Sequence, residues 1–191
     1  MIQRLAENKL RAMADKFPVL VVTGPRQSGK TTLAKTCFSD YRYVSLENPQ
    51  TLDFALSDPV GFLAIYDRQV IIDEAQNAPE LFSYIQQIVD DSQLAGQYIL
   101  SGSQNFLLLE KITQSLAGRV YIMELLPLCH TEITQHGNPR IEQELFHGSY
   151  PRLYNMNISA VDFYPAYIKT YVERDVRTII NVQELKSFRK F

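Results

Sequence analysis

The stretch that decides the fold is Gly24-Pro25-Arg26-Gln27-Ser28-Gly29-Lys30-Thr31, which is followed by Thr32. It fits the pattern GxxxxGK[ST], in which a glycine-containing loop joins a strand to a helix. Its two glycines allow backbone angles that turn N–H groups inward around phosphate oxygens. Pro25 has no N–H and is expected to shape the turn instead. Residues 24–32 are therefore the predicted phosphate-binding residues.

Two side chains of this loop have the chemistry that a bound nucleotide needs. Lys30 supplies a full positive charge to the β- and γ-phosphates, and the Thr31 hydroxyl is a hard oxygen ligand for Mg²⁺. The apolar run Val19-Leu20-Val21-Val22 before the loop predicts a buried strand, and residues 30–38 after it predict a helix. The positive end of that helix dipole points at the same place.

A second signal is the acidic pair Asp73-Glu74, which directly follows the apolar run Val70-Ile71-Ile72. It is predicted to lie at the carboxyl end of a buried strand, where open α/β sheets bind ligands. We expect Asp73 to hold Mg²⁺ through water and Glu74 to act as the general base on the attacking water. Taken alone, such a pair is more often a solvated turn or a helix cap. The nearby Gln76 and Asn77 either position water or cap a helix, with capping favoured.

A third polar segment, Ser101-Gly102-Ser103-Gln104, follows the fourth predicted strand. In this architecture Ser103, with Gln104 next, is expected to touch the γ-phosphate or the attacking water. The alternative is a Ser/Gly turn that leads into a helix. Arg119 follows a turn of small residues and is a candidate for stabilising transition-state charge, in its own chain or across a subunit contact. A surface ion pair is the other interpretation of Arg119.

Strands and helices alternate through the first part of the chain. Apolar runs predict strands over 17–22, 43–46, 69–73, 97–100 and 119–123, and three-four spacing predicts helices over 2–16, over 30–38 and after Pro79. The separation of 73 − 30 = 43 residues between the two motifs leaves room for an intervening strand and a crossover helix. This order predicts an α/β layered fold with a five-stranded, mostly parallel sheet.

The sequence pattern changes after about Pro127, from alternating strand and helix signals to helical and turn signals. Residues 1–129 are the expected core, and residues 130–191 are an expected helical appendage. The appendage ends without a cap, which suggests truncation before another domain; an ordinary frayed terminus is the alternative explanation. Arg174 and Arg177 lie in a predicted helix of alternating charges, and either is a candidate to reach the nucleotide. Such a charge pattern is more often a solvated, ion-paired face. The three histidines lack metal-ligand spacing and are assigned no chemistry: His130, His136 and His147.

Composition limits the function classes. The chain has 191 residues, 46% hydrophobic and 21% charged, with a formal net charge of −2. That balance excludes a disordered chain and does not indicate nucleic-acid binding. It does not exclude a local patch of basic residues. Two cysteines are too few for a disulfide framework. No apolar run reaches the length of a membrane span, so we expect a cytoplasmic protein without a membrane partner.

The chain resembles prokaryotic AAA-superfamily ATPases of largely unassigned function. The resemblance rests on residues 24–32, 70–76, 100–104, 115–120, 150–151 and 170–177, in that order. It implies an ASCE-type P-loop sheet, a three-layer sandwich with one strand inserted between those that carry the phosphate loop and Asp73. It also implies that Glu74 is the catalytic base, that Ser103 takes the sensor position, and that Arg119 is the candidate sensor or finger. Full-length members continue into a further C-terminal domain, often nuclease-like in fold.

The leading functional hypothesis is a Mg²⁺-dependent ATPase that passes its nucleotide state to a protein partner, an oligomer or a missing domain. One alternative is a nucleotide-gated scaffold that binds ATP without significant hydrolysis. A small-molecule kinase is a further alternative, for which the sequence shows no acceptor-binding motif. A GTPase is disfavoured because no NKxD-type motif for reading guanine occurs.

Overall fold

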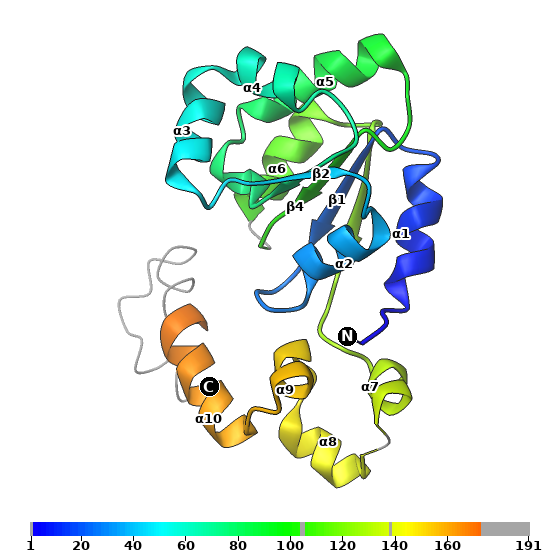
Figure 1. Cartoon of the computed structure of the whole chain (residues 1–191), viewed down its shortest axis with the longest axis vertical. Coiled ribbons are helices and arrows are strands. Elements are labelled where there is room, and N and C mark those ends of the chain that lie inside the picture. The colour runs from blue at the N-terminus through cyan, green and yellow to red at the C-terminus, as the bar shows by residue number, and fades with distance from the viewer. Residues whose placement is uncertain (1, 104–105, 138, 173–191) are drawn as a thin grey trace. The chain divides into compact units, whose positions relative to one another are not determined.

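The structure is a computed structural model that describes residues 2–103, 106–137 and 139–172 (Figure 1). The chain divides into two compact units. The larger unit is Gln3–Leu128, and the smaller combines Ile2 with the chain from Cys129 onward. Buried hydrophobic clusters lie within each unit: two in the described residues of the larger unit and one in those of the smaller.

The larger unit is built on a five-stranded sheet in the spatial order β2-β3-β4-β1-β5. All four strand pairings are parallel, which confirms the predicted α/β class. β4 lies between β1 and β3, so the inserted strand that the resemblance implied is present. Each strand lies within two residues of its expected position: β1 Val19–Thr23, β2 Arg42–Ser45, β3 Val70–Asp73, β4 Tyr98–Ser101 and β5 Val120–Glu124.

Helices accompany the sheet in the larger unit (Figure 1). The helix predicted over 2–16 is shorter, and the helix expected to open at Pro79 begins two residues later. Between β2 and β3 the chain forms two helices rather than one crossover helix. The helices are α1 Ala6–Ala14, α2 Lys30–Cys37, α3 Pro49–Ser57, α4 Pro59–Ile65, α5 Leu81–Ser92 and α6 Phe106–Ser115.

Local sequence explains the break between α3 and α4. Each helix has a proline in its first turn, where the missing N–H costs no helical hydrogen bond. The Asn48 side chain accepts hydrogen bonds from the N–H groups of Gln50 and Thr51 at the start of α3. The Asp58 side chain accepts one from Gly61 at the start of α4. These caps and prolines are start signals that our sequence analysis missed.

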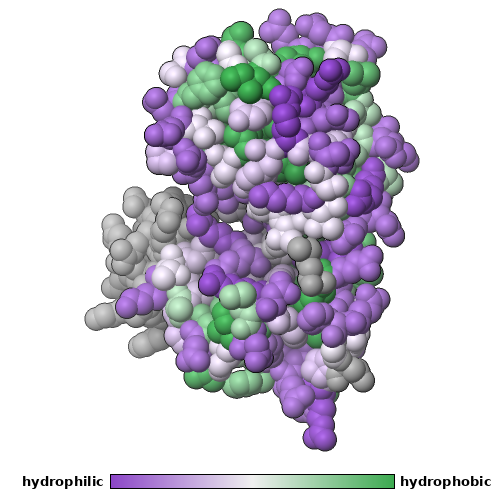
Figure 2. Space-filling view, in the orientation of Figure 1, coloured by the Kyte–Doolittle hydropathy of each residue, from purple (hydrophilic) through white to green (hydrophobic). Residues whose placement is uncertain are grey.

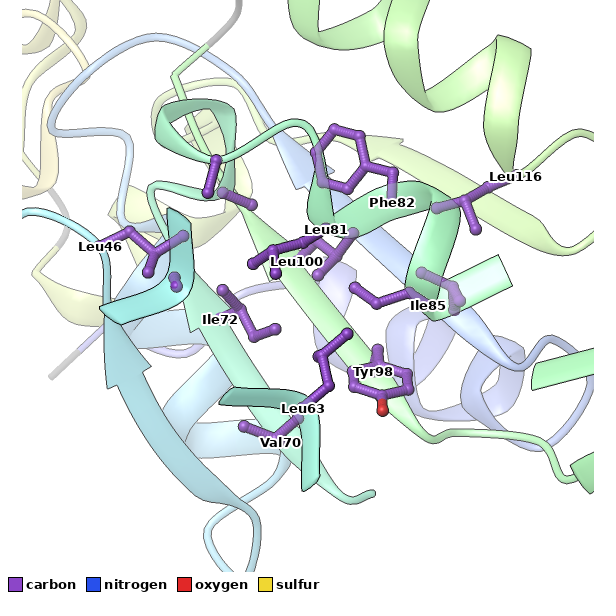
Figure 3. Close-up of a cluster of buried hydrophobic side chains, with 14 of the residues drawn as sticks. Leu46, Leu63, Val70, Ile72, Leu81, Phe82, Ile85, Tyr98, Leu100 and Leu116 are labelled. Carbon is purple, nitrogen blue, oxygen red and sulfur yellow. The ribbon is translucent and has the colours of Figure 1, made fainter. Parts of the chain in front are cut away.

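Alternating side chains of the sheet enter two separate cores. Val19, Val21, Val70 and Ile72 join a cluster with residues of α3, α4, α5 and α6. Figure 3 shows part of this cluster, where Leu63 and Ile85 approach the sheet residues Val70, Ile72 and Tyr98. The strand residues between them point the other way and pack with α1 and α2: Leu20, Val22, Ile71 and Ile99. The fold is thus a three-layer sandwich with helices on both faces of the sheet.

The smaller unit consists of short helices around an aromatic cluster. Leu153, Phe163 and Tyr167 are buried, and partly buried tyrosines surround them. The helix expected from residue 158 is described as far as Val172, so Arg174 and Arg177 lie outside the described residues. The helices are α7 His130–His136, α8 Ile141–His147, α9 Pro151–Met156, α10 Ala160–Tyr167 and a π-helix over Ile168–Val172.

Hydrophilic residues cover much of the visible surface, interrupted by hydrophobic patches (Figure 2). In the larger unit, exposed apolar side chains include Leu56, Val60 and Ile65 of α3 and α4. Among the described residues, no helix is both long and apolar enough to cross a membrane.

Candidate functional site

Three strands deliver the predicted functional residues to one edge of the sheet. β1, β3 and β4 are parallel neighbours, so their carboxyl ends meet there. Asp73 pairs in register with Ser101, and Ser101 also pairs with Val22, just before the loop of residues 24–31. The two motifs, 43 residues apart in sequence, are neighbours at this edge.

The loop backbone has the conformation that its glycines permit. Gly24 has a φ of 137°, and a Cβ there would lie 2.2 Å from the carbonyl oxygen of Leu125. Gly29 has a φ of 94° and immediately precedes α2. No side chain caps this end of α2, so its first amides point into the loop without a side-chain acceptor.

Lys30 folds back into the loop that carries it. Its side chain is buried, with 7% exposed, and Nζ donates hydrogen bonds to the carbonyl oxygens of Gly24 and Pro25 at 3.0 and 2.9 Å. Burial lowers the pKa of Lys30, and the negative charges of Glu74 and Asp73 act against that shift. The Ser28 hydroxyl is also buried and has no hydrogen-bond partner among the described residues. The loop therefore contains a buried hydroxyl whose hydrogen-bonding capacity no described residue satisfies.

Asp73 lies at the centre of a group of hydroxyls. Its side chain is 8% exposed. The Thr31 hydroxyl donates to both carboxylate oxygens, at 3.1 and 3.0 Å, and the Tyr43 hydroxyl donates to Oδ2 at 3.0 Å. The Ser101 hydroxyl donates to Oδ1. The pKa of Tyr43 is raised to about 12. Partial burial of the phenol is the largest cause, and the negative charge of Asp73 is the next. The phenol is protonated at neutral pH.

Tyr43 and Ser101 were missed as site residues by the sequence analysis. Ser101 ends β4, and the pattern Ser101-Gly102-Ser103 offered it, but Ser103 was preferred. Tyr43 belongs to β2, which flanks β3 in the sheet. No motif marks it, and only the strand order brings it to Asp73.

Glu74 has an unusual backbone, with φ 54° and ψ 44° in the left-handed region. Its carboxylate accepts a hydrogen bond from Nε2 of Gln76, and the same nitrogen lies 3.5 Å from the Ser103 hydroxyl. Gln76 thus connects the predicted base to the predicted sensor. The Asn77 side chain donates a hydrogen bond to the Leu46 carbonyl oxygen at 3.1 Å, which connects it to the segment after β2. Gln104 lies outside the described residues.

The expectation that Arg119 acts on the nucleotide of its own chain is wrong. It precedes β5, whose first residue Val120 pairs with Val19 at the amino end of β1. The phosphate loop lies at the other end of β1, and five strand residues separate the two ends by about 16 Å. Arg119 instead forms an ion pair with Asp90 of α5, with a second hydrogen bond of 2.8 Å. This is the surface ion pair that was the other interpretation.

The donor set fits Mg²⁺ that arrives with a nucleotide. Thr31 and Asp73 offer hard oxygens at hydrogen-bonding distance from each other. In the described part of the chain, no three His, Cys, Asp or Glu side chains form a group that could hold a metal ion. A magnesium ion held by one carboxylate, one hydroxyl and phosphate oxygens fits such a site.

The first strand of this parallel sheet runs into a GxxxxGK[ST] loop, and an acidic residue ends a strand two places away in the sheet. These features define the class of P-loop nucleotide-binding domains. The family described as "AAA domain" matches residues 16–134, and the chain belongs to this family. Residues 138–191 match a second family, described as a domain of unknown function.

Relatives of similar sequence include two uncharacterized mycobacterial proteins. Rv2008c of Mycobacterium tuberculosis and Mb2031c of Mycobacterium bovis are each 30% identical to this chain over 177 residues. The match covers 91% of this chain and 40% of each relative. The chain therefore spans about two fifths of the length of these relatives.

Two solved structures share the fold. The Walker-type ATPase PABY2304 of Pyrococcus abyssi has a TM-score of 0.60 at 15% identity, covering 93% of this chain and 75% of that one. AMPPCP-bound DnaA from Aquifex aeolicus has a TM-score of 0.54 at 14% identity, covering 89% of this chain and 64% of that one. At these identities the likeness concerns the architecture, which is that of a P-loop ATPase.

Proposed function

We propose that this chain binds ATP with Mg²⁺ in the loop of residues 24–32 and hydrolyses ATP to ADP and phosphate. The observation that carries the proposal is the convergence at one sheet edge of Lys30, Thr31, Asp73 and Glu74. Thr31 is hydrogen-bonded to Asp73, and both carboxylates act electrostatically on Lys30. A cation, a hydroxyl and two carboxylates beside a glycine-permitted anion cradle are the groups that phosphoryl transfer to water requires.

Each residue has a separate proposed role. Lys30, which donates to carbonyl oxygens of its own loop, would donate to the β- and γ-phosphates instead. Thr31 and Asp73 would hold Mg²⁺, which when bound neutralises charge on the phosphate oxygens. Glu74 would orient the attacking water and accept its proton as the water oxygen bonds to the γ-phosphorus. The bond from that phosphorus to the bridging oxygen of the β-phosphate breaks in the same step, and ADP leaves with that oxygen. Ser103, which Gln76 connects to Glu74, would contact the same water or the γ-phosphate.

A second candidate function is a nucleotide-gated scaffold that binds ATP and passes its nucleotide state to a protein partner or an oligomer without turnover. The specific observation in its favour is that Nε2 of Gln76 already donates a hydrogen bond to Oε2 of Glu74. A base that keeps this amide hydrogen bond has less capacity to accept a proton from water. The two functions share the binding site and differ only in the chemical step.

Phosphate release from ATP and Mg²⁺ tests the proposal on the 191-residue chain. We expect turnover by the parent, a loss of about 100-fold or more in Glu74→Gln with binding retained, and loss of binding in Lys30→Ala. Glu80→Gln and Lys16→Ala are matched controls, since both side chains are exposed. Equal phosphate release by the parent and Glu74→Gln would favour the scaffold. Unchanged ATP affinity in Lys30→Ala would contradict the site itself.

A further inference from the structure

Tyr43 makes a contact with the predicted magnesium site that none of the sequence motifs covers. It belongs to β2, and its hydroxyl donates to Oδ2 of Asp73 at 3.0 Å. The Thr31 hydroxyl donates to the same oxygen at 3.0 Å. A residue from the edge strand therefore shares a carboxylate oxygen with the phosphate loop.

The position of Tyr43 follows from the sheet register. Tyr43 pairs with Ile71, and Ile71 packs with the cluster that contains residues of α2. Paired residues of neighbouring strands lie on the same face of a sheet, so Tyr43 is on the α2 side. Asp73 comes two residues after Ile71 on that face, within reach of a tyrosine side chain.

Lys35 of α2 contacts the aromatic ring of Tyr43. Its Nζ lies 3.3 Å from the centroid of the Tyr43 ring, a cation–π contact. Lys35 comes four residues after Thr31, and residues at this spacing are neighbours on one face of a helix. One face of α2 thus presents Thr31 to Asp73 and Lys35 to the tyrosine that also contacts Asp73.

We propose that Tyr43, held by Lys35, is a positioning residue that orients Asp73 and so sets the affinity of the site for the Mg²⁺ that accompanies a nucleotide. The inference rests on the proposed function, because it assigns a role toward the metal of that same site. It names no new reacting group: Tyr43 acts through Asp73.

The hydrogen bonds of Asp73 give Tyr43 this role. Among the described residues three hydroxyls donate to the carboxylate, and one of them, that of Thr31, belongs to a proposed metal ligand. Ser101 and Tyr43 are the other two, one on each carboxylate oxygen. Fixing both oxygens fixes the plane of the carboxylate, and outer-shell hydrogen bonds of this kind tune metal affinity. Ser101 is buried, whereas Tyr43 is 39% exposed, so the Tyr43 hydroxyl can be removed without opening a core cavity.

The test compares the affinity of the chain for a fluorescent N-methylanthraniloyl ADP in Mg²⁺ and in EDTA. Tyr43→Phe removes the hydroxyl and keeps the ring over which Lys35 lies. We expect the strengthening of ADP binding by Mg²⁺ to fall about tenfold in Tyr43→Phe. The affinity in EDTA should stay that of the parent, because the phosphate loop is untouched. A general structural defect would weaken binding equally in both buffers.

Two further variants complete the test. Tyr98→Phe is the matched control, since the Tyr98 hydroxyl donates to the Asp67 carbonyl oxygen at the opposite edge of the sheet and should leave the ratio unchanged. Lys35→Met keeps an unbranched side chain without the charge and should lower the ratio in the same direction as Tyr43→Phe. An unchanged ratio in Lys35→Met would remove Lys35 from the inference.

The outcomes separate this inference from the proposed function. If the parent shows no ADP binding that Mg²⁺ strengthens, the proposed function fails. If the parent shows it and Tyr43→Phe has the same ratio, a higher ratio, or equal losses in both buffers, the role of Tyr43 is overturned while the proposed function stands.

Discussion

Gly24 shows how a single residue can limit the shape of the proposed site. Its φ of 137° lies in a region that L side chains rarely adopt, and the position of its missing Cβ is occupied by the Leu125 carbonyl oxygen. The first glycine of the loop is therefore needed for two separate physical reasons. Both concern the backbone, because no side chain at this position can be tolerated in the observed conformation.

Gly24→Ala is expected to destabilise the larger unit and weaken nucleotide binding. Backbone strain alone costs about 1–3 kcal/mol, and the contact with Leu125 adds to it. Gly118→Ala is the control, since Gly118 also has a positive φ but its added Cβ would meet no atom within 4 Å. Urea unfolding and ADP titration of both variants check this expectation. Equal losses in the two variants would show that the Leu125 contact is unimportant.

At the scale of elements, apolar runs were enough to predict the five strands. Runs such as Val70-Ile71-Ile72 are buried on both faces because helices cover the sheet on both sides. The approach of Thr31 to Asp73 was predictable for a related reason. Each residue belongs to a motif at the carboxyl end of a strand, and the carboxyl ends of parallel strands lie at the same edge of the sheet.

Other parts of the site depend on information that the local sequence does not contain. Tyr43 reaches Asp73 only because β2 flanks β3, and strand order is set by packing of the whole sheet. Arg119 was misassigned because a turn of small residues says nothing about the sheet edge at which it lies. Its place before β5 puts it at the amino edge.

Arg4 connects the phosphate loop to another element. Its guanidinium donates to the Ser28 carbonyl oxygen in the loop and to the Leu126 carbonyl oxygen after β5, each at 2.7 Å. Arg11 of α1 makes comparable bonds to the end of α2, donating to the carbonyl oxygens of Thr36 and Cys37. Both arginines thus donate hydrogen bonds from the guanidinium group to backbone carbonyl oxygens, in the phosphate loop for Arg4 and at the end of α2 for Arg11.

Arg4→Ala is expected to lower the free energy of unfolding by about 1–2 kcal/mol, the size of a partly exposed charged hydrogen bond, and to weaken ADP binding. Arg11→Ala should lower stability by a similar amount and leave ADP affinity unchanged, because its acceptors lie outside the loop. Chemical denaturation and ADP titration measure the two effects. Unchanged ADP affinity in Arg4→Ala would mean that the loop keeps its shape without this bond.

At the scale of the whole molecule, ligand binding and folding are linked. A ligand that binds only the folded state adds about 2.7 kcal/mol of stability at 100 times its dissociation constant. For a chain of this size, that amount raises the unfolding temperature by about 5–10 °C. We expect this shift with ADP and Mg²⁺, followed by circular dichroism, and a smaller shift when EDTA removes the metal.

Lys30→Ala should show no such shift, since the loop has lost the cation that meets the phosphates. Lys16→Ala, which changes an exposed lysine, should respond as the parent does. A shift of the parent's size in Lys30→Ala would place the ADP elsewhere on the molecule.

The left-handed backbone of Glu74 has a consequence for how this chain can be improved or degraded by mutation. Glycine adopts that conformation with less strain than glutamate, so local backbone preference favours replacing the residue. The same replacement would delete the carboxylate proposed to accept a proton. A screen that selects for thermal stability alone would therefore tend to select variants that lack the proposed catalytic base at this position.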